Sequence, residues 1–225
     1  MVLDNPVWTS LTGAHAPLAI GDGVARRYPA EVGVFAAVEA PTKLALDALA
    51  EIVAPGEVVG LFALDAQRVA GPWTVAAEME LIQMVGEIDL TPPEAPVVEL
   101  ASTDTEKMLA LAQVTQPGPF GLRTIEMGRY AGRWEGDKLA AMAGERLKPT
   151  GYTEVSAVCT DPAFRGQGHA QVLVRAIGAQ IQQRGETPFL HVAAGSASES
   201  TAVGVYERLG FRQRVRCSLT ILQRS

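Results

Sequence analysis

Two glycines stand in a segment that could bind a phosphate group: Arg165, Gly166, Gln167, Gly168, His169 and Ala170. The preceding run, Tyr152 to Thr160, is rich in β-branched and apolar residues and predicts a buried strand. Apolar residues then recur at helical spacing until Gly185, which predicts a helix. Because glycine lacks a Cβ and a helix N-terminus favours negative charge, an anion can approach the backbone N–H groups here. The junction therefore suggests a phosphate-bearing cofactor.

The glycine segment on its own is weak evidence, because an ordinary tight turn between a strand and a helix has the same composition. The segment lacks the Lys-Ser/Thr ending of a P-loop. The region also lacks the three-glycine dinucleotide fingerprint with its acidic residue. A second motif has to decide between a plain turn and a cofactor site.

That second motif is residues 202–211, which read Ala-Val-Gly-Val-Tyr-Glu-Arg-Leu-Gly-Phe. Its second glycine predicts the end of a helix, and the aromatic residue after it leads into a strand. The two spaced motifs together resemble those of the GNAT superfamily of acyl-CoA-dependent N-acyltransferases. The resemblance covers roughly Val97 to Thr220. A stretch from Asp137 to Arg146 looks like the branch that contains glycine N-acyltransferase-like proteins.

The resemblance implies an α+β protein with the GNAT fold, in which helices flank a mixed, mostly antiparallel central sheet. It also implies acetyl-CoA or another short acyl-CoA as cosubstrate, and direct attack of an amine on the thioester in a ternary complex. The segment from Arg165 to Ala170 would bind the pyrophosphate. Pantetheine would lie along the strand at Val158, Cys159 and Thr160, where a backbone N–H near Val158 would polarise the thioester carbonyl.

Two side chains are candidates for proton transfer. Tyr206 is placed by its motif to protonate the departing thiolate, for which a phenol is a plausible donor. Its ring could instead pack against the cofactor helix. Glu154 is the candidate base, because it lies early on the thioester strand and burial would raise its pKa. A chain of water molecules is the alternative, and Glu145 and Glu126 are weaker candidates.

The acceptor side carries little information in the sequence. Phe120, in the irregular segment from Gln116 to Gly121, either contacts the substrate or plugs the core under a loop. The acceptor is expected to be a small-molecule amine or a peptide. Two other functions stay open: a non-catalytic CoA-binding or sensor protein of the same fold, and an acetyltransferase acting on protein N-termini or lysines.

One position departs from the family pattern. Glu199 stands where an asparagine usually precedes the tyrosine-bearing helix. The spacing of Ser196 and Glu199 predicts a capping box instead, with Ser196 as N-cap and Glu199 as the third helical residue. A carboxylate close to anionic CoA would be unfavourable, so Glu199 is expected to point away from the cofactor or to weaken its binding.

Charge is divided unevenly along the 225 residues. Residues 1–96 hold 4 Lys+Arg and 13 Asp+Glu, a net charge of −9, whereas residues 97–225 hold 15 and 12, a net charge of +3. A mildly basic second half suits a phosphate-bearing cofactor, and an acidic first half argues against nucleic acid as partner. No apolar run suggests a membrane span or a secretory signal, so we expect a cytoplasmic enzyme. The oligomeric state stays open.

Three prolines between Thr91 and Pro96 predict a linker, because proline interrupts both helices and central strands. We therefore expect an N-terminal α/β lobe over residues 1–90, which resembles a degenerate GNAT-like half by its order of elements, and an acyl-CoA-binding catalytic domain over residues 97–225. Within the first lobe, strands are expected at 31–38 and 58–64, with a helix at 42–53 between them. Residues 73–84 are ambiguous between helix and strand.

In the second half we expect a strand at 97–100, a helix at 103–112 with Thr103 as its N-cap, and a hairpin of strands 129–134 and 138–147. His169 and His191 are expected to be core or surface residues, and Cys159 and Cys217 small buried ones. Three scattered histidines and two cysteines give no metal-ligand spacing.

Overall fold

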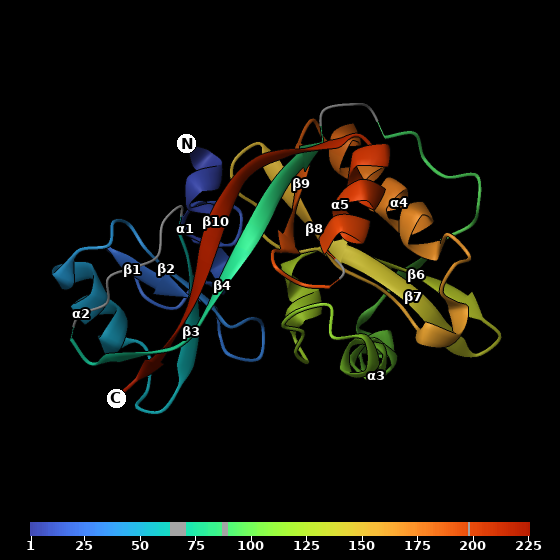
Figure 1. The fold of residues 1–225 in the computed structure, drawn as a ribbon. Helices are drawn as coiled ribbons and strands as arrows, with labels where there is room; N and C mark the ends of the chain where they lie inside the picture. Colours follow the sequence, from blue (N-terminus) through green and yellow to red (C-terminus); the bar gives the residue numbers. More distant parts are fainter. Residues whose placement is uncertain (64–70, 87–89, 198) are drawn as a thin grey trace.

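The structure, a computed structural model, describes residues 1–63, 71–86, 90–197 and 199–225. Its centre is one ten-stranded sheet in the order β1-β2-β3-β10-β4-β9-β8-β7-β6-β5 (Figure 1). The pairs β2–β3 and β8–β9 are parallel, and the other neighbouring strands are antiparallel. The expected α+β architecture, with a mixed and mostly antiparallel sheet flanked by helices, is confirmed.

The described residues of the first half form four strands and two α-helices. These are α1 (Pro6–Leu11), β1 (Ala25–Arg27), β2 (Phe35–Val38), α2 (Lys43–Glu51), β3 (Val58–Ala63) and β4 (Trp73–Gly86), with 3₁₀ turns at Val2–Asp4 and Ala16–Leu18. Thr42 caps α2 by accepting the backbone N–H of Ala45 at 3.2 Å, so this helix is confirmed. The first predicted strand is shorter than expected, and the ambiguous residues 73–84 belong to a strand.

The second half supplies the remaining elements. These are β5 (Val98–Leu100), α3 (Thr105–Thr115), β6 (Tyr130–Glu135), β7 (Lys138–Glu145), β8 (Tyr152–Thr160), α4 (His169–Gln183), β9 (Thr187–Ala193), α5 (Glu199–Arg208) and β10 (Phe211–Arg224), with 3₁₀ turns at Ser102–Asp104, Thr124–Met127 and Pro162–Phe164. The predicted hairpin is confirmed. Thr103 as the N-cap of α3 was wrong, because a 3₁₀ turn precedes the helix and Asp104 occupies that position.

The two halves share hydrogen bonds through β4. This strand pairs with β10 from Trp73 to Gly86 and with β9 from Leu81 to Val85, so it lies between two strands of the second half. In Figure 1, β4 and β10 run side by side as a long ribbon from the N-terminal elements to α4 and α5. The division at 1–90, 91–96 and 97–225 stays a prediction, and the central sheet is continuous across it.

Helices cover the two faces of the sheet around β8. On one face, Leu173, Val174 and Ile177 of α4 pack with Val155 of β8. On the other, Met108 and Leu111 of α3 pack in a cluster that includes residues of β6, β7 and β8. Figure 1 shows α4 and α5 on one side of these strands and α3 on the other. Strand β8 is therefore buried between two helical layers.

Candidate active site

The glycine loop leaves β8 and enters α4 in the conformation that the sequence predicts. Gly166 has φ of +81° and Gly168 has φ of +79°, the left-handed region that glycine adopts without strain. A Cβ added at either position would meet no other described residue within 4 Å. Arg165 to Gly168 are exposed, and Gly168 directly precedes the 15-residue helix α4. The loop thus presents open backbone at a helix N-terminus, where an anion binds well.

The side chains of Arg165 and His169 in this loop differ in their exposure to solvent. Arg165 is exposed, and its Nε donates to the carbonyl of Thr160 at 3.4 Å. His169 is 5% exposed, and its Nδ1 accepts a hydrogen bond from Nε of Arg133 at 3.4 Å. The imidazole therefore points into the protein beneath the loop, as expected of a core histidine. The backbone N–H of His169 lies at the start of α4.

A β-bulge interrupts β8 just where the thioester is expected to lie. Met142 of β7 pairs with Cys159 and Gly144 pairs with Ser156, so Ala157 and Val158 together oppose one residue of β7. Ala157 has φ of +52°, which is unusual for a residue with a side chain. The bulge shifts the alternation of side chains, because Val155 packs on the α4 face whereas Ala157, two residues later, packs on the α3 face.

Beside the bulge, β8 and β9 separate. Their parallel pairing spans only Tyr152–Thr187, Thr153–Pro188 and Glu154–Phe189. Farther along, β8 keeps β7 as neighbour and β9 keeps β4. In the described part of the chain, the β9-facing edge of β8 from Val155 to Thr160 consequently has no strand beside it. An extended group such as pantetheine can pair with an edge of this kind, which is the place that Val158, Cys159 and Thr160 were predicted to provide.

Tyr206 lies on α5 and packs against the same apolar cluster as Val158. Its ring meets Phe211 edge-on, with centroids 6.0 Å apart. Burial raises the pKa of Tyr206 to about 12, so its hydroxyl stays protonated at neutral pH. The hydroxyl makes no hydrogen bond within the described ranges, which leaves its proton free for a bound molecule.

The chain is similar to proteins of one superfamily. The FR47-like protein family matches residues 130–219. A GNAT-family protein from Novosphingobium aromaticivorans is 36% identical, with 100% of this chain and 99% of that chain covered and a TM-score of 0.92. The chain belongs to the GNAT family. Acyl transfer from acetyl-CoA is the activity general to this superfamily. Among curated proteins, none matched the sequence.

A more distant structure shows how far the GNAT fold is kept. A GCN5-related N-acetyltransferase from Kribbella flavida is 16% identical, covers 96% of this chain and 95% of its own, and has a TM-score of 0.62. At that identity the likeness concerns the fold alone. It extends over the N-terminal half as well as over the motifs.

The environment of Glu154 in this GNAT protein differs from the expected one. Its side chain is 1% exposed, and both carboxylate oxygens accept hydrogen bonds from Arg146, at 2.7 and 2.8 Å. His191 Nδ1 lies 2.7 Å from one of these oxygens. Burial raises the pKa of Glu154, but the charge and hydrogen bonds of Arg146, with those of His191, outweigh it and lower the pKa well below its usual range. The expectation of a raised pKa for Glu154 was wrong, because no pattern in the sequence showed that Arg146 lies beside this carboxylate.

Arg146 and His191 are the site residues that the sequence reasoning missed. Arg146 follows β7 and is largely buried, with its guanidinium 4.9 Å from the ring centroid of Phe35. His191 Nε2 lies 3.1 Å from the side-chain nitrogen of Gln83. Nδ1 of the same ring faces Glu154, so His191 links the Gln83 amide to the Glu154 carboxylate. An arginine at the end of an otherwise apolar strand was the available signal.

The other acidic candidates are also held in ion pairs. Glu145 is fully buried, and its oxygens lie 2.8 Å from Nζ of Lys148 and 2.7 Å from Arg184. Glu126 is paired with Arg123 at the surface, at 2.7 Å. Neither carboxylate lies on the strand that carries the bulge.

Phe120 lies on the α3 face. Its ring meets that of Tyr130 edge-on, with centroids 5.7 Å apart, and both belong to the cluster under α3. Phe120 also lines a hollow of about 350 Å³ at the end of α3, together with Leu109 and Gln113. Phe120 therefore packs in the core and also lines a surface hollow, and its contact with a substrate stays a prediction.

Glu199 turns toward the protein backbone. Its carboxylate accepts the N–H of Gly195 at 2.5 Å and lies 3.3 Å from Arg216. Helix α5 is described from Glu199 onward, and residue 198, between Ser196 and Glu199, lies outside the described residues, so the capping box stays a prediction. Ser196 Oγ donates to the carbonyl of Ala193 at 3.1 Å.

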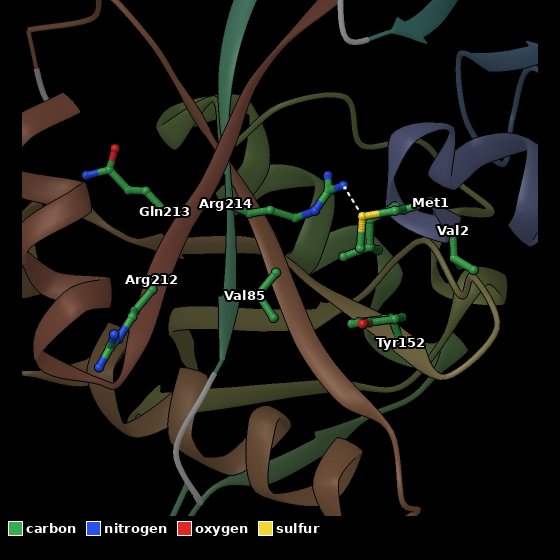
Figure 2. Close-up of a pocket in the computed structure, with 8 residues that line it drawn as sticks. Met1, Val2, Val85, Tyr152, Arg212, Gln213 and Arg214 are labelled. Atoms are coloured by element: carbon green, nitrogen blue, oxygen red, sulfur yellow. Dashed lines mark hydrogen bonds between the residues drawn. The ribbon is translucent and has the colours of Figure 1, made fainter.

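A separate hollow of about 550 Å³ lies at the far end of β8 (Figure 2). It is lined by Met1, Val2, Leu3, Val85, Tyr152, Arg212, Gln213 and Arg214. Tyr152 is the first residue of β8, whereas the glycine loop follows the last residue, Thr160. We place the chemistry at the separation of β8 and β9, because the bulge and the phosphate loop meet there.

Proposed function

We propose that this GNAT protein transfers an acetyl or another short acyl group from acyl-CoA to a primary amine, in a ternary complex. The observation that carries the proposal is the succession of three features along the chain: a bulge at Ala157, an unpaired strand edge that continues to Thr160, and an open glycine loop at the start of α4. In this order they would accommodate the thioester, the pantetheine and the pyrophosphate of acyl-CoA.

Acyl-CoA supplies the activated acyl group as a thioester. Backbone N–H groups of the loop from Arg165 to Ala170 bind the pyrophosphate, with Arg165 as counter-charge. The edge of β8 at Val158 and Thr160 aligns pantetheine, and a backbone N–H beside the bulge polarises the carbonyl. The C–N bond forms as the C–S bond breaks, and Tyr206 gives its proton to the leaving sulfur before regaining one from solvent.

The amine has to lose a proton during the transfer. An effective general base has a pKa near the working pH, whereas Arg146 holds that of Glu154 far below it. We therefore assign this proton to water and give Glu154 the role of a fixed charge that holds Arg146 and His191 in place. Glu154 as direct base stays the alternative.

The proposed acceptor class, a primary amine, rests on the family and on few residues. A small-molecule amine and a peptide N-terminus both belong to this class. The segment from Asp137 to Arg146, which suggested the glycine N-acyltransferase-like branch, forms the turn, the strand β7 and the buried arginine. Assignment to that branch, a cytoplasmic location and the absence of nucleic-acid partners stay predictions. No described helix is long and apolar enough to cross a membrane.

Release of free CoA tests the proposal directly. Purified protein is mixed with acetyl-CoA and a panel of benzylamine, tyramine, spermidine, lysine and short peptides with a free N-terminus, and the new thiol is titrated. We expect amine-dependent thiol release and an acetylated product by mass spectrometry. Tight acetyl-CoA binding without release for any amine would instead favour a non-catalytic sensor.

A further inference from the structure

Tyr130 carries a buried hydroxyl without a partner. The residue is 1% exposed, and its hydroxyl makes no hydrogen bond in the part of the chain that the structure describes. A buried polar group usually has a partner, because leaving it unpaired destabilises the fold. Tyr28, which is just as buried, follows this rule: its hydroxyl lies 2.8 Å from Nδ1 of His15. The unpaired hydroxyl of Tyr130 therefore suggests that a bound molecule supplies its hydrogen-bond partner.

The ring of Tyr130 crosses β7 toward the bulge of β8. Tyr130 is paired with Gly144, and Gly144 with Ser156 of β8, which directly precedes Ala157. A Cβ at position 144 would overlap the ring of Tyr130, so the glycine makes room for it. Tyr130 also packs in one buried cluster with Ala157, the residue at the bulge beside which the proposed function places the thioester.

Tyr130 lies on the face of β8 opposite to the cofactor helix. Tyr206 packs with α4 and Val158, whereas Tyr130 packs with α3, Ala157 and Cys159. Phe120, which touches Tyr130, also lines the hollow of about 350 Å³ at the end of α3. Phe120 thus contacts the ring of Tyr130 and also lines this surface hollow.

We propose that the hydroxyl of Tyr130 hydrogen-bonds the acceptor amine and orients it for attack on the thioester. A neutral hydroxyl can accept an N–H of the amine, which leaves the nitrogen lone pair free to point at the carbonyl. No proton is transferred to Tyr130. The inference rests on the proposed function and adds to it a specificity-determining residue that the two sequence motifs do not contain.

Tyr130→Phe tests this assignment, because it removes the hydroxyl and keeps the ring. With the best amine of the panel, we expect kcat/KM for the amine to fall by at least about 10-fold, the loss typical of one hydrogen bond in a site. The Kd of acetyl-CoA should stay unchanged. The Tm should stay the same or rise by about 2–4 °C, since an unpaired buried group is removed.

Tyr28→Phe is the matched control. It removes a partnered hydroxyl of an equally buried tyrosine and leaves His15 without that bond, so its Tm should fall. Lower activity together with higher stability in Tyr130→Phe supports a ligand-binding hydroxyl, because a structural role lowers both. If the wild type is active and Tyr130→Phe keeps the same kcat/KM, the assignment of Tyr130 alone is overturned. A wild type that releases no CoA with any amine would refute the proposed function and the assignment with it.

Discussion

The two faces of β8 contribute different kinds of groups to the proposed site. The α4 face contributes backbone groups, in an open strand edge and a glycine loop that is contiguous in sequence. On the opposite face, side chains distant in sequence meet: Arg146 and His191 both contact the carboxylate of Glu154, and Tyr130 packs under α3. In the proposed function, the first arrangement recognises a constant part of the cofactor, and the second can vary with the acceptor.

This difference leads to different responses to mutation. A backbone site is sensitive to added side chains and to charge in the loop, with little effect on the buried core. A buried ion-pair cluster is sensitive to the loss of either partner, because the remaining charge is left uncompensated. We therefore expect variants of the α4 face to lose function while remaining folded, and variants of the Glu154 cluster to lose stability first.

The largest effect on rate is expected from Tyr206→Phe. Losing the acid that protonates the thiolate should lower kcat about 100-fold and leave the Kd of acetyl-CoA unchanged. Tyr152→Phe is a matched control, because its ring also packs edge-on against a phenylalanine, at 6.4 Å, but at the opposite end of β8. Steady-state kinetics of both variants decide the point. Equal rates for Tyr206→Phe and wild type would leave Tyr206 as a packing residue.

The largest effect on stability is expected from Glu154→Gln. The substitution leaves Arg146 buried without its counter-charge, which should lower the free energy of unfolding by about 3–5 kcal/mol. Glu99 forms the same two-point pair with Arg129, at 3.0 and 3.1 Å, but at the surface. Glu99→Gln should therefore cost at most about 1 kcal/mol. Urea denaturation compares the two, and similar losses would contradict the contrast between buried and exposed pairs.

Acidification should destabilise the folded protein in two stages. Burial lowers the pKa of His15 to about 4, below its ordinary value of 6.5, so the unfolded chain takes up this proton first. Stability is then lost as pH falls from about 6.5 toward 4, by up to about 1.4 kcal/mol per pH unit. Because the pKa of Glu154 is also lowered in the folded protein, a second loss follows below about pH 4.5.

Denaturation curves at stepped pH values test both stages. The first loss should disappear in His15→Gln, and the second should be reduced in Glu154→Gln. A stability that does not change between pH 7 and 4 would contradict the account of both buried groups.

The sequence predicted the α4 face better than the α3 face, for a physical reason. The glycine loop, its strand and its helix are local, so spacing and backbone preference suffice to place Gly166, Gly168 and α4. The pKa of Glu154 depends on Arg146 and His191, which no local pattern brings to it. Likewise, the placement of β4 between β9 and β10 depends on long-range pairing, and the ambiguous pattern of residues 73–84 did not indicate it.

Acetyl-CoA binding measured by calorimetry on three proteins tests the central claim most directly: wild type, Gly168→Glu and Gly185→Glu. Gly168 and Gly185 share nearly the same backbone conformation, with φ of +79° and +78°, and both stand in open surroundings at opposite ends of α4. The strain of the new side chain is therefore matched, and only Gly168→Glu places a negative charge in the phosphate loop. We predict micromolar binding by wild type and by Gly185→Glu, and its loss in Gly168→Glu. Equal binding by both variants, or none by a folded wild type, would contradict the cofactor site.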